Sequence, residues 1–289
     1  MINYKPVVII GAGRSGTNML RDTLTQIAGV ETWPCDEINY IWRHHNVTHK
    51  TDEFTSDMAT SKAKKYIRQK FDEMAEETNA KYLVEKTCAN SLRVEFVQNV
   101  VPEAKYLHIV RDGRDVVESA KKRWEAPLDT EYIGEKMRFV PKSDLPYYGF
   151  KYFLNRLYKI TSRENRLASW GPQFTGMTEQ LKKVSLEEVC AYQWKASVEK
   201  ATNAFKNFIP SSQYHTIYYE DFVEHPVKNM KQICAFLNIE ITPEEIERLT
   251  QDVSSKSVGK GVKTLSDKNL LERVNTILNP AMERHQYEM

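Results

Sequence analysis

The stretch VVIIGAGRSGTNML, from Val7 to Leu20, decides how the first part of the chain folds. Its β-branched apolar residues predict a buried strand, its glycines predict a tight turn, and the pattern that follows predicts an amphipathic helix. A strand–turn–helix unit directs several backbone N–H groups and the positive end of the helix dipole at one point, where phosphate or sulfate binds. The stretch therefore predicts an anion-binding loop at residues 11–16.

Two familiar nucleotide-binding schemes fit this loop poorly. A dinucleotide site needs an acidic residue after a second strand, about 20 residues further along the chain. Glu31 lies near that distance, but residues 29–34 contain Pro34 and are not expected to form a central strand. A kinase or NTPase loop continues with Lys and then Ser or Thr, whereas Thr17 follows Gly16 directly. The loop therefore binds an anion in some other scheme.

Short apolar runs alternate with helical patterns along the rest of the chain. They predict strands at residues 6–11, 81–85, 104–110 and 214–219, and helices at residues 17–28, 56–77, 91–100, 114–124, 185–208 and 221–237. This alternation predicts one α/β domain over residues 1–289, with a P-loop-type central parallel sheet flanked by helices and a ligand site at the carboxyl ends of the strands.

The composition excludes several classes of protein. A net charge of +2 over 289 residues gives no basic field of the kind that nucleic-acid binders carry. No apolar run approaches the roughly 18 residues of a membrane span, and residues 1–6 lead into a strand without room for a signal peptide. The four cysteines are far apart, which favours reduced thiols. We therefore expect a cytoplasmic protein with no nucleic-acid partner and no membrane span.

A second motif, YLHIVRDGRDVVESAKKRW at residues 106–124, follows one of the predicted strands. Arg111 lies at the end of that strand, and Ser119 lies eight residues later on the next predicted helix. This spacing lets a guanidinium group and a hydroxyl converge on a second phosphate. The alternative is a structural ion pair between Arg111 and Asp112 or Asp115.

Together the two motifs resemble those of the sulfotransferases that use 3′-phosphoadenosine 5′-phosphosulfate (PAPS). The similarity covers about the first 125 residues and residues 214–265, with Asn18 and Gly113 as departures from the family pattern. It implies that Arg14, Ser15, Gly16, Thr17 and Asn18 bind the 5′-phosphosulfate and that Arg111 and Ser119 bind the 3′-phosphate. It also implies that Tyr219 lies near the adenine. The loop that closes over the 3′-phosphate would contain Ser257, Lys260 and Gly261.

The resemblance also implies the chemistry. PAPS would donate the sulfuryl group without a metal ion, and 3′-phosphoadenosine 5′-phosphate (PAP) would leave. Glu37 resembles the family's acidic base, with Asp36 as the second candidate, while Lys86 and Arg14 would stabilise charge on the leaving group. A histidine base, as in other members of the family, stays open as an alternative at His44, His45 or His49. His45 and His49, four residues apart, could instead bind a metal ion.

The acceptor is the least determined part of the prediction. Residues 125–210 are expected to contain its recognition region, because they match no other part of the family pattern. Aromatic residues concentrate at 147–158, where they could stack on sugar rings or pack within the protein. A hydroxyl on a glycan or polysaccharide is the first expectation, and a peptide tyrosine or a small alcohol is the alternative. An atypical P-loop kinase and an inactive nucleotide-binding protein remain competing functions.

Overall fold

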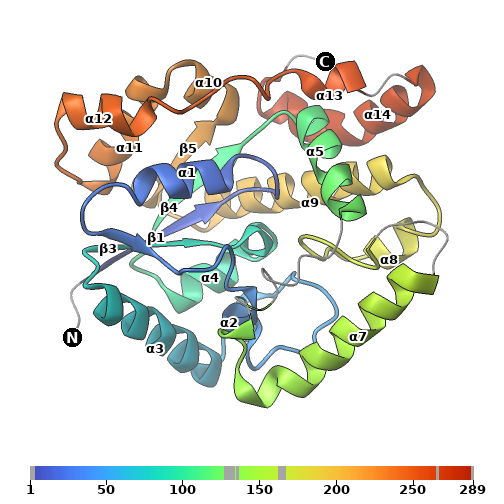
Figure 1. The fold of residues 1–289 in the computed structure, drawn as a ribbon, viewed down its shortest axis with the longest axis horizontal. Helices are drawn as coiled ribbons and strands as arrows, with labels where there is room; N and C mark the ends of the chain where they lie inside the picture. Colours follow the sequence, from blue (N-terminus) through green and yellow to red (C-terminus); the bar gives the residue numbers. More distant parts are fainter. Residues whose placement is uncertain (1–3, 127–133, 135–136, 162–166, 265–266, 288–289) are drawn as a thin grey trace.

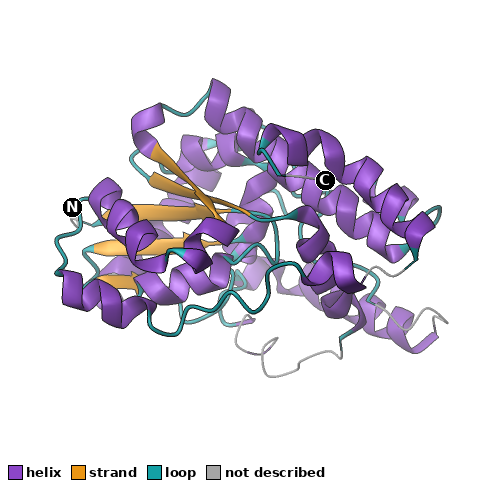
Figure 2. Cartoon of the chain, turned by 90° about the horizontal axis from the view of Figure 1, so that it is seen from above, coloured by secondary structure: helices purple, strands orange, loops and turns teal. Residues whose placement is uncertain are grey.

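The fold is built on a five-stranded sheet in the order β2-β3-β1-β4-β5, with every pair of neighbouring strands parallel. The computed structural model describes residues 4–126, 134, 137–161, 167–264 and 267–287. Its strands are β1 (Lys5–Ile10), β2 (Val30–Thr32), β3 (Tyr82–Lys86), β4 (Lys105–Val110) and β5 (Tyr214–Tyr218). Figure 2 shows the strands as one layer with helices on both sides. The predicted single-domain α/β fold with a parallel sheet is confirmed.

Alternate residues of the central strands pack against different helices. Val8 and Ile10 belong to a core formed with α2 (Asn39–Arg43), α3 (Ser61–Thr78), α4 (Val94–Val100) and α9 (Leu186–Asn207). Val7 and Ile9 belong to a core formed with α1 (Thr17–Leu24), α10 (Tyr219–Glu224), α11 (Pro226–Leu237) and α12 (Pro243–Thr250). Figure 1 shows these two sets of helices on opposite sides of the sheet. Burial of both faces explains why the strand sequences are apolar throughout.

A third core joins helices beyond the edge of the sheet where the strands end. It contains buried residues of α5 (Gly113–Glu125), α9 and α14 (Lys268–Arg284). The remaining helical segments are α7 (Leu145–Thr161), α8 (Met177–Gln180), α13 (Lys260–Thr264), and the short 3-10 turns η1 (Ser56–Met58), η2 (Cys88–Leu92), η3 (Lys142–Asp144) and η4 (Ser211–Gln213). Among the described residues, no helix is both long enough and apolar enough to cross a membrane.

Several expected elements differ in their extent. The helix predicted at residues 221–237 is two helices, because Pro226 lacks an N–H and begins α11. The helix predicted at residues 56–77 begins only at Ser61, after Thr60 caps it by accepting from the Ala63 N–H. The helix predicted to reach residue 28 ends at Leu24.

Several elements in the structure were not predicted: the strand β2 and the helices α2, α7, α8, α12, α13 and α14. Residues 30–32 form β2, but at the edge of the sheet and beside β3 instead of β1. This order differs from the dinucleotide-binding fold, in which the second strand pairs with the first. Residues 145–161, which show little periodicity because aromatic and charged residues occur on several faces, form the helix α7. The four cysteines, Cys35, Cys88, Cys190 and Cys234, are all buried.

Candidate active site

The loop between β1 and α1 has the conformation that an anion-binding turn requires. Arg14 and Gly16 both have left-handed backbone conformations, with φ of 73° and 90°. Glycine is required at position 16 because a Cβ there would lie 2.4 Å from the Tyr219 ring. Gly11 approaches the β4 backbone, where a Cβ would lie 2.8 Å from the carbonyl oxygen of Ile109. The loop therefore passes close to the strand ends and starts α1 directly at them.

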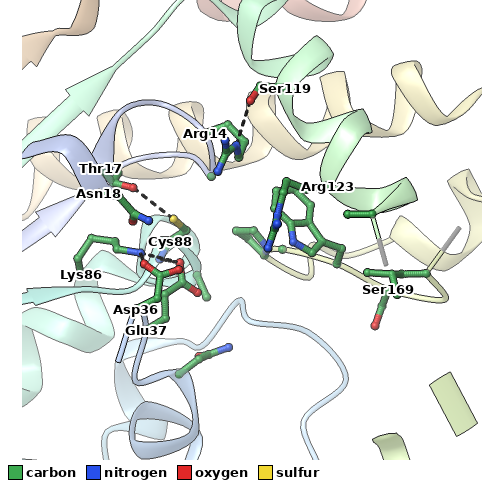
Figure 3. Close-up of a pocket in the computed structure, with 18 of the residues that line it drawn as sticks. Arg14, Thr17, Asn18, Asp36, Glu37, Lys86, Cys88, Ser119, Arg123 and Ser169 are labelled. Atoms are coloured by element: carbon green, nitrogen blue, oxygen red, sulfur yellow. Dashed lines mark hydrogen bonds and ion pairs between the residues drawn. The ribbon is translucent and has the colours of Figure 1, made fainter. Parts of the chain in front are cut away.

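A cavity of about 1000 Å³ opens at this edge of the sheet. Residues of the first loop, α1, α2, the end of β3 and α5 form one part of its wall, and residues of α7, the segment 167–173 and the segment 257–260 form another. Asp36, Glu37, Asp52, Arg111 and Tyr219 also line it. Figure 3 shows the loop and the end of β3 contributing side chains to the same space. The carboxyl ends of parallel strands are where α/β proteins bind their ligands.

The two predicted phosphate-binding motifs meet on the wall of this cavity. Arg14 Nε donates to Ser119 Oγ at 3.0 Å, which links the first loop to α5 (Figure 3). Arg111 donates from Nη1 to the Arg14 carbonyl at 3.2 Å, and its guanidinium lies 4.3 Å from the centroid of the Tyr219 ring. The Tyr219 hydroxyl lies 2.6 Å from Ser257 Oγ. The structure thus brings residues from four separated segments together.

The loop at residues 254–261, called the late loop below, is attached to α5 by Asp115. The sequence did not indicate this contact. Asp115 Oδ2 accepts from the Gly259 N–H at 2.9 Å, and its Oδ1 accepts from the Gly261 N–H at 2.6 Å. Lys260 and Ser257 line the cavity, whereas Gly261 lies outside the described wall and uses its N–H on Asp115. A Cβ at Gly261 would lie 2.2 Å from the Arg114 carbonyl oxygen, so only glycine permits this contact.

Other members of the first loop occupy different places. Thr17 Oγ1 lies 3.7 Å from Cys88 Sγ (Figure 3), and Asn18 lines the cavity. Ser15 is fully buried, and its hydroxyl has no hydrogen-bond partner within the described parts of the chain. Ser15 is therefore placed to contribute its backbone to the turn, while Arg14 contributes its side chain to the cavity.

Two carboxylates and a lysine form the acid–base group of the site. Lys86 Nζ donates to Asp36 Oδ1 at 2.8 Å and to Glu37 Oε1 at 3.3 Å (Figure 3). Glu37 Oε1 also accepts from the Cys88 N–H at 3.2 Å. Burial alone would lower the pKa of Lys86, but the negative charges of Glu37 and Asp36 raise it above its ordinary value. Lys86 therefore stays charged, and the ionised form of Glu37 is stabilised by two donors.

The histidine alternatives lie elsewhere. His44 Nδ1 pairs with Asp144 Oδ2 at 2.9 Å, and His49 Nδ1 lies 3.0 Å from the Thr51 carbonyl oxygen. Within the described structure, neither of these histidines nor His45 lines the cavity. The geometry thus favours a carboxylate over a histidine as the group that faces a bound acceptor.

Several residues on the cavity wall had no signal strong enough to be singled out from the sequence. Arg123 lies one helical turn after Ser119, a spacing that could have indicated it. Lys151 belongs to α7, which was not predicted, and Trp170 to a loop without periodicity. Partial burial and the neighbouring charge of Arg123 lower the pKa of Arg14. The two guanidinium groups therefore repel each other, and a bound anion would offset this repulsion.

Comparison with known families decides what kind of enzyme this is. The sequence model of the sulfotransferase family matches residues 6–140 and 155–243. The chain belongs to the sulfotransferase family. This sulfotransferase matches none of the curated protein sequences. The function expected from the two phosphate motifs is confirmed at the level of the enzyme class.

Solved structures of other sulfotransferases have the same fold as this sulfotransferase. The sulfotransferase domain from the curacin biosynthetic pathway is 16% identical, with a TM-score of 0.54 and 99% of each chain covered. Sulfotransferase STF9 from Mycobacterium avium is 11% identical, with a TM-score of 0.55 over 100% of this chain and 79% of that chain. Mouse sulfotransferase SULT7A1, complexed with PAP, is 14% identical, with a TM-score of 0.50 over 96% and 85% of the two chains.

Proposed function

We propose that this sulfotransferase moves a sulfuryl group from PAPS to an acceptor hydroxyl and releases PAP. The observation that carries the proposal is the convergence of Arg14, Arg111 and Ser119 at the carboxyl edge of the sheet. Two guanidinium groups and a hydroxyl beside a helix N-terminus suit the two separate phosphate positions of PAP. The PAP complex of the mouse enzyme agrees with this choice of nucleotide.

The nucleotide would lie across the segments that meet at this edge. The first loop, with Arg14 to Asn18, would bind the 5′-phosphosulfate through its N–H groups. Arg111, Ser119 and Lys260 would bind the 3′-phosphate, and Tyr219 would lie against the adenine. Ser257 and Gly261 would act through the loop they belong to, because the Gly261 N–H is already used by Asp115.

The transfer is an in-line displacement at sulfur. The acceptor oxygen forms a bond to sulfur as the bond between sulfur and the 5′-phosphate oxygen breaks, and the acceptor proton passes to Glu37. Glu37 suits this role because its carboxylate lines the cavity beside Lys86, where it can accept the acceptor proton. Lys86 and Arg14 would stabilise the negative charge that develops on the leaving phosphate.

The acceptor hydroxyl we propose is one on a sugar. Aromatic side chains on α2, α7 and the segment 167–173 line the part of the cavity beyond Glu37: Tyr40, Tyr148, Tyr152 and Trp170. Aromatic faces stack on sugar rings and on phenols, so the tyrosine of a peptide and a small alcohol are the alternatives. The described residues of 125–210 supply most of this aromatic wall, in keeping with a role in acceptor recognition.

Calorimetric titration with PAP, ADP and NAD tests the choice of nucleotide. We expect PAP to bind at least tenfold more tightly than ADP, because only PAP carries the 3′-phosphate that Arg111 and Ser119 would contact. Sulfuryl transfer from labelled PAPS to a mixed oligosaccharide acceptor, measured with EDTA present, then tests the reaction. Equal binding of PAP and ADP, with turnover that requires a divalent metal ion, would favour a kinase.

A further inference from the structure

The charge on the cavity wall is unequal. Among the described lining residues there are eight basic side chains and five acidic ones. The basic ones are Arg14, Arg43, Lys86, Arg111, Lys122, Arg123, Lys151 and Lys260, and the acidic ones are Asp36, Glu37, Asp52, Asp115 and Glu118. A cation on the cavity wall that has no carboxylate partner keeps its charge available for an anionic group of a bound ligand.

Every acidic side chain on this wall already has a basic partner. Asp36 and Glu37 pair with Lys86, Asp115 with Arg111, and Glu118 with Lys122. Asp52 is taken by Arg43, whose Nη1 lies 2.7 Å from Oδ1, and its Oδ2 accepts from the Gln173 N–H at 2.8 Å. In the part of the chain that the structure describes, this leaves four cations of the wall without a carboxylate partner, which are Arg14, Arg123, Lys151 and Lys260.

Three of these four cations lie where the nucleotide is proposed to bind. Arg14 contacts Ser119, and Arg123 lies one helical turn beyond Ser119 on α5. Lys260 begins α13, directly after the loop whose Ser257 contacts Tyr219. The phosphate and sulfate groups of PAPS would compensate these three charges.

Lys151 belongs to a different part of the cavity. It lies on α7 between two tyrosines of the wall, Tyr148 and Tyr152. The ring of Tyr148 contacts the ring of Tyr40 edge to face, with centroids 4.5 Å apart. Tyr40 follows Glu37 by three residues, and both line the same cavity as Lys151. Lys151 is exposed at the cavity, where partial loss of water and the positive charge of Arg43 lower its pKa while the negative charge of Asp52 opposes the shift.

We propose that the acceptor carries an anionic group of its own, a carboxylate or a sulfate ester, which binds Lys151. The inference rests on the proposed function and deepens it. The aromatic rings of Tyr40, Tyr148 and Tyr152 would contact the body of the acceptor, while the anion pairs with the ammonium and the hydroxyl reaches Glu37. Recognition therefore combines one charge and one apolar surface, and a neutral acceptor of the same shape forms no ion pair with Lys151.

Matched acceptors that differ in charge test this assignment. One pair is 4-nitrophenyl β-D-glucuronide and 4-nitrophenyl β-D-glucoside, and the other is 4-hydroxyphenylacetate and 4-methylphenol. We expect kcat/KM for the anionic member of the productive pair to be at least tenfold higher, and the Lys151→Gln variant to lose that preference. The matched control is Lys182→Gln, which removes an exposed lysine outside the cavity wall and should keep the preference. A wild-type protein without preference, or equal proportional losses for both members, overturns the proposal.

A binding measurement keeps the test independent of which hydroxyl reacts. The nucleotide-binding part of the cavity is first saturated with PAP. The protein is then titrated with the aromatic sulfonate 8-anilinonaphthalene-1-sulfonate or with its uncharged parent N-phenyl-1-naphthylamine, and binding is followed by fluorescence. We expect tighter binding of the sulfonate by at least fivefold, and loss of that advantage in Lys151→Gln. Equal affinities overturn the proposal. Failure of the protein to bind PAP contradicts the proposed function instead, so the two failures are distinguishable.

Discussion

Glu37 and Asp36 are neighbours in the sequence, but their carboxylates have different surroundings. Glu37 Oε1 accepts from the Cys88 N–H and lies beside Lys86 on the cavity wall, whereas Asp36 Oδ1 is shared between Lys86 and Arg21, the latter at 3.0 Å. We expect Glu37→Gln to lower kcat by at least about 100-fold, because an amide cannot take the acceptor proton. PAP affinity, measured by calorimetry, should change little.

The Asp36→Asn variant is the matched control for this prediction. It removes one negative charge from the same pair of residues but keeps Glu37, so kcat should fall less than in Glu37→Gln. If Glu37→Gln keeps near-normal turnover and a His44 or His45 substitution abolishes it, the base is a histidine.

Arg111 has both a ligand-facing role and a structural one. Its guanidinium lines the cavity and stacks on Tyr219, while Nη2 donates to the Ser257 carbonyl at 2.7 Å. We expect Arg111→Ala to weaken PAP binding by about 2–3 kcal/mol, the scale of a charge-assisted contact. Binding of adenosine 5′-phosphosulfate, which lacks the 3′-phosphate, should change far less. Equal losses for both ligands would mean that Arg111 acts only by holding the loop at Ser257.

The predictability of individual site residues depends on how local their signal is. Arg14, Arg111 and Ser119 could be singled out because each lies at a fixed spacing from a strand end or a helix start. Asp115 and Lys151 could not, because their importance comes from partners far away in the sequence: Gly259 and Gly261 for Asp115, and the wall around Arg43 for Lys151.

At the scale of elements, the late loop illustrates how a helix positions a distant segment. Asp115 on α5 accepts from the N–H groups of Gly259 and Gly261, and its carboxylate is almost fully buried. We expect Asp115→Asn to weaken PAP binding about tenfold, because the loss of one acceptor and of the negative charge loosens the loop that carries Ser257 and Lys260. Hydrogen exchange of residues 254–261 should become faster in the same variant. Unchanged exchange with weakened PAP binding would mean that Asp115 does not act through the loop.

The elements that could be predicted are those with one dominant period. Strands β1, β3, β4 and β5 are apolar runs that both faces of the sheet bury, so their positions agree with expectation to within a residue or two. The helix α7 could not be predicted, because Tyr148 and Lys151 face the cavity while Phe150 and Phe153 are exposed. Such a distribution produces no single apolar face for the pattern to reveal.

At the scale of the whole molecule, the site depends on segments that the sheet brings to one edge. The parallel sheet and the position of the cavity at the carboxyl ends of its strands could be anticipated from the alternation of strands and helices, whereas the strand order could not. The acceptor side could not, since it is assembled from α2, α7 and the segment 167–173, which share no sequence motif. The anionic group that we propose on the acceptor is indicated only by the charged side chains that the folded cavity brings together.

The stability of the whole protein should depend on pH through a buried carboxyl beneath the cavity. Glu85 is fully buried at the end of β3; its Oε2 accepts from Asn90 Nδ2 at 2.9 Å, while its Oε1 has no hydrogen-bond partner among the described residues. Burial raises the pKa of Glu85 from 4.5 to about 7, although Arg93 and Lys86 oppose the shift. The folded protein therefore keeps a proton on Glu85 over a range of pH in which the unfolded chain has lost it.

The sign of the effect follows from that difference. As pH rises from about 4.5 to about 7, folding must take up a proton that the unfolded chain has lost, so stability falls by up to about 3 kcal/mol and levels off at higher pH. The Glu85→Gln variant lacks this titration. We compare the free energy of unfolding of this variant with that of the wild type by urea denaturation. The value for the variant minus the value for the wild type should be more positive at pH 8 than at pH 5. A stability difference that is constant over this range would show that Glu85 has the same pKa in the folded and unfolded protein.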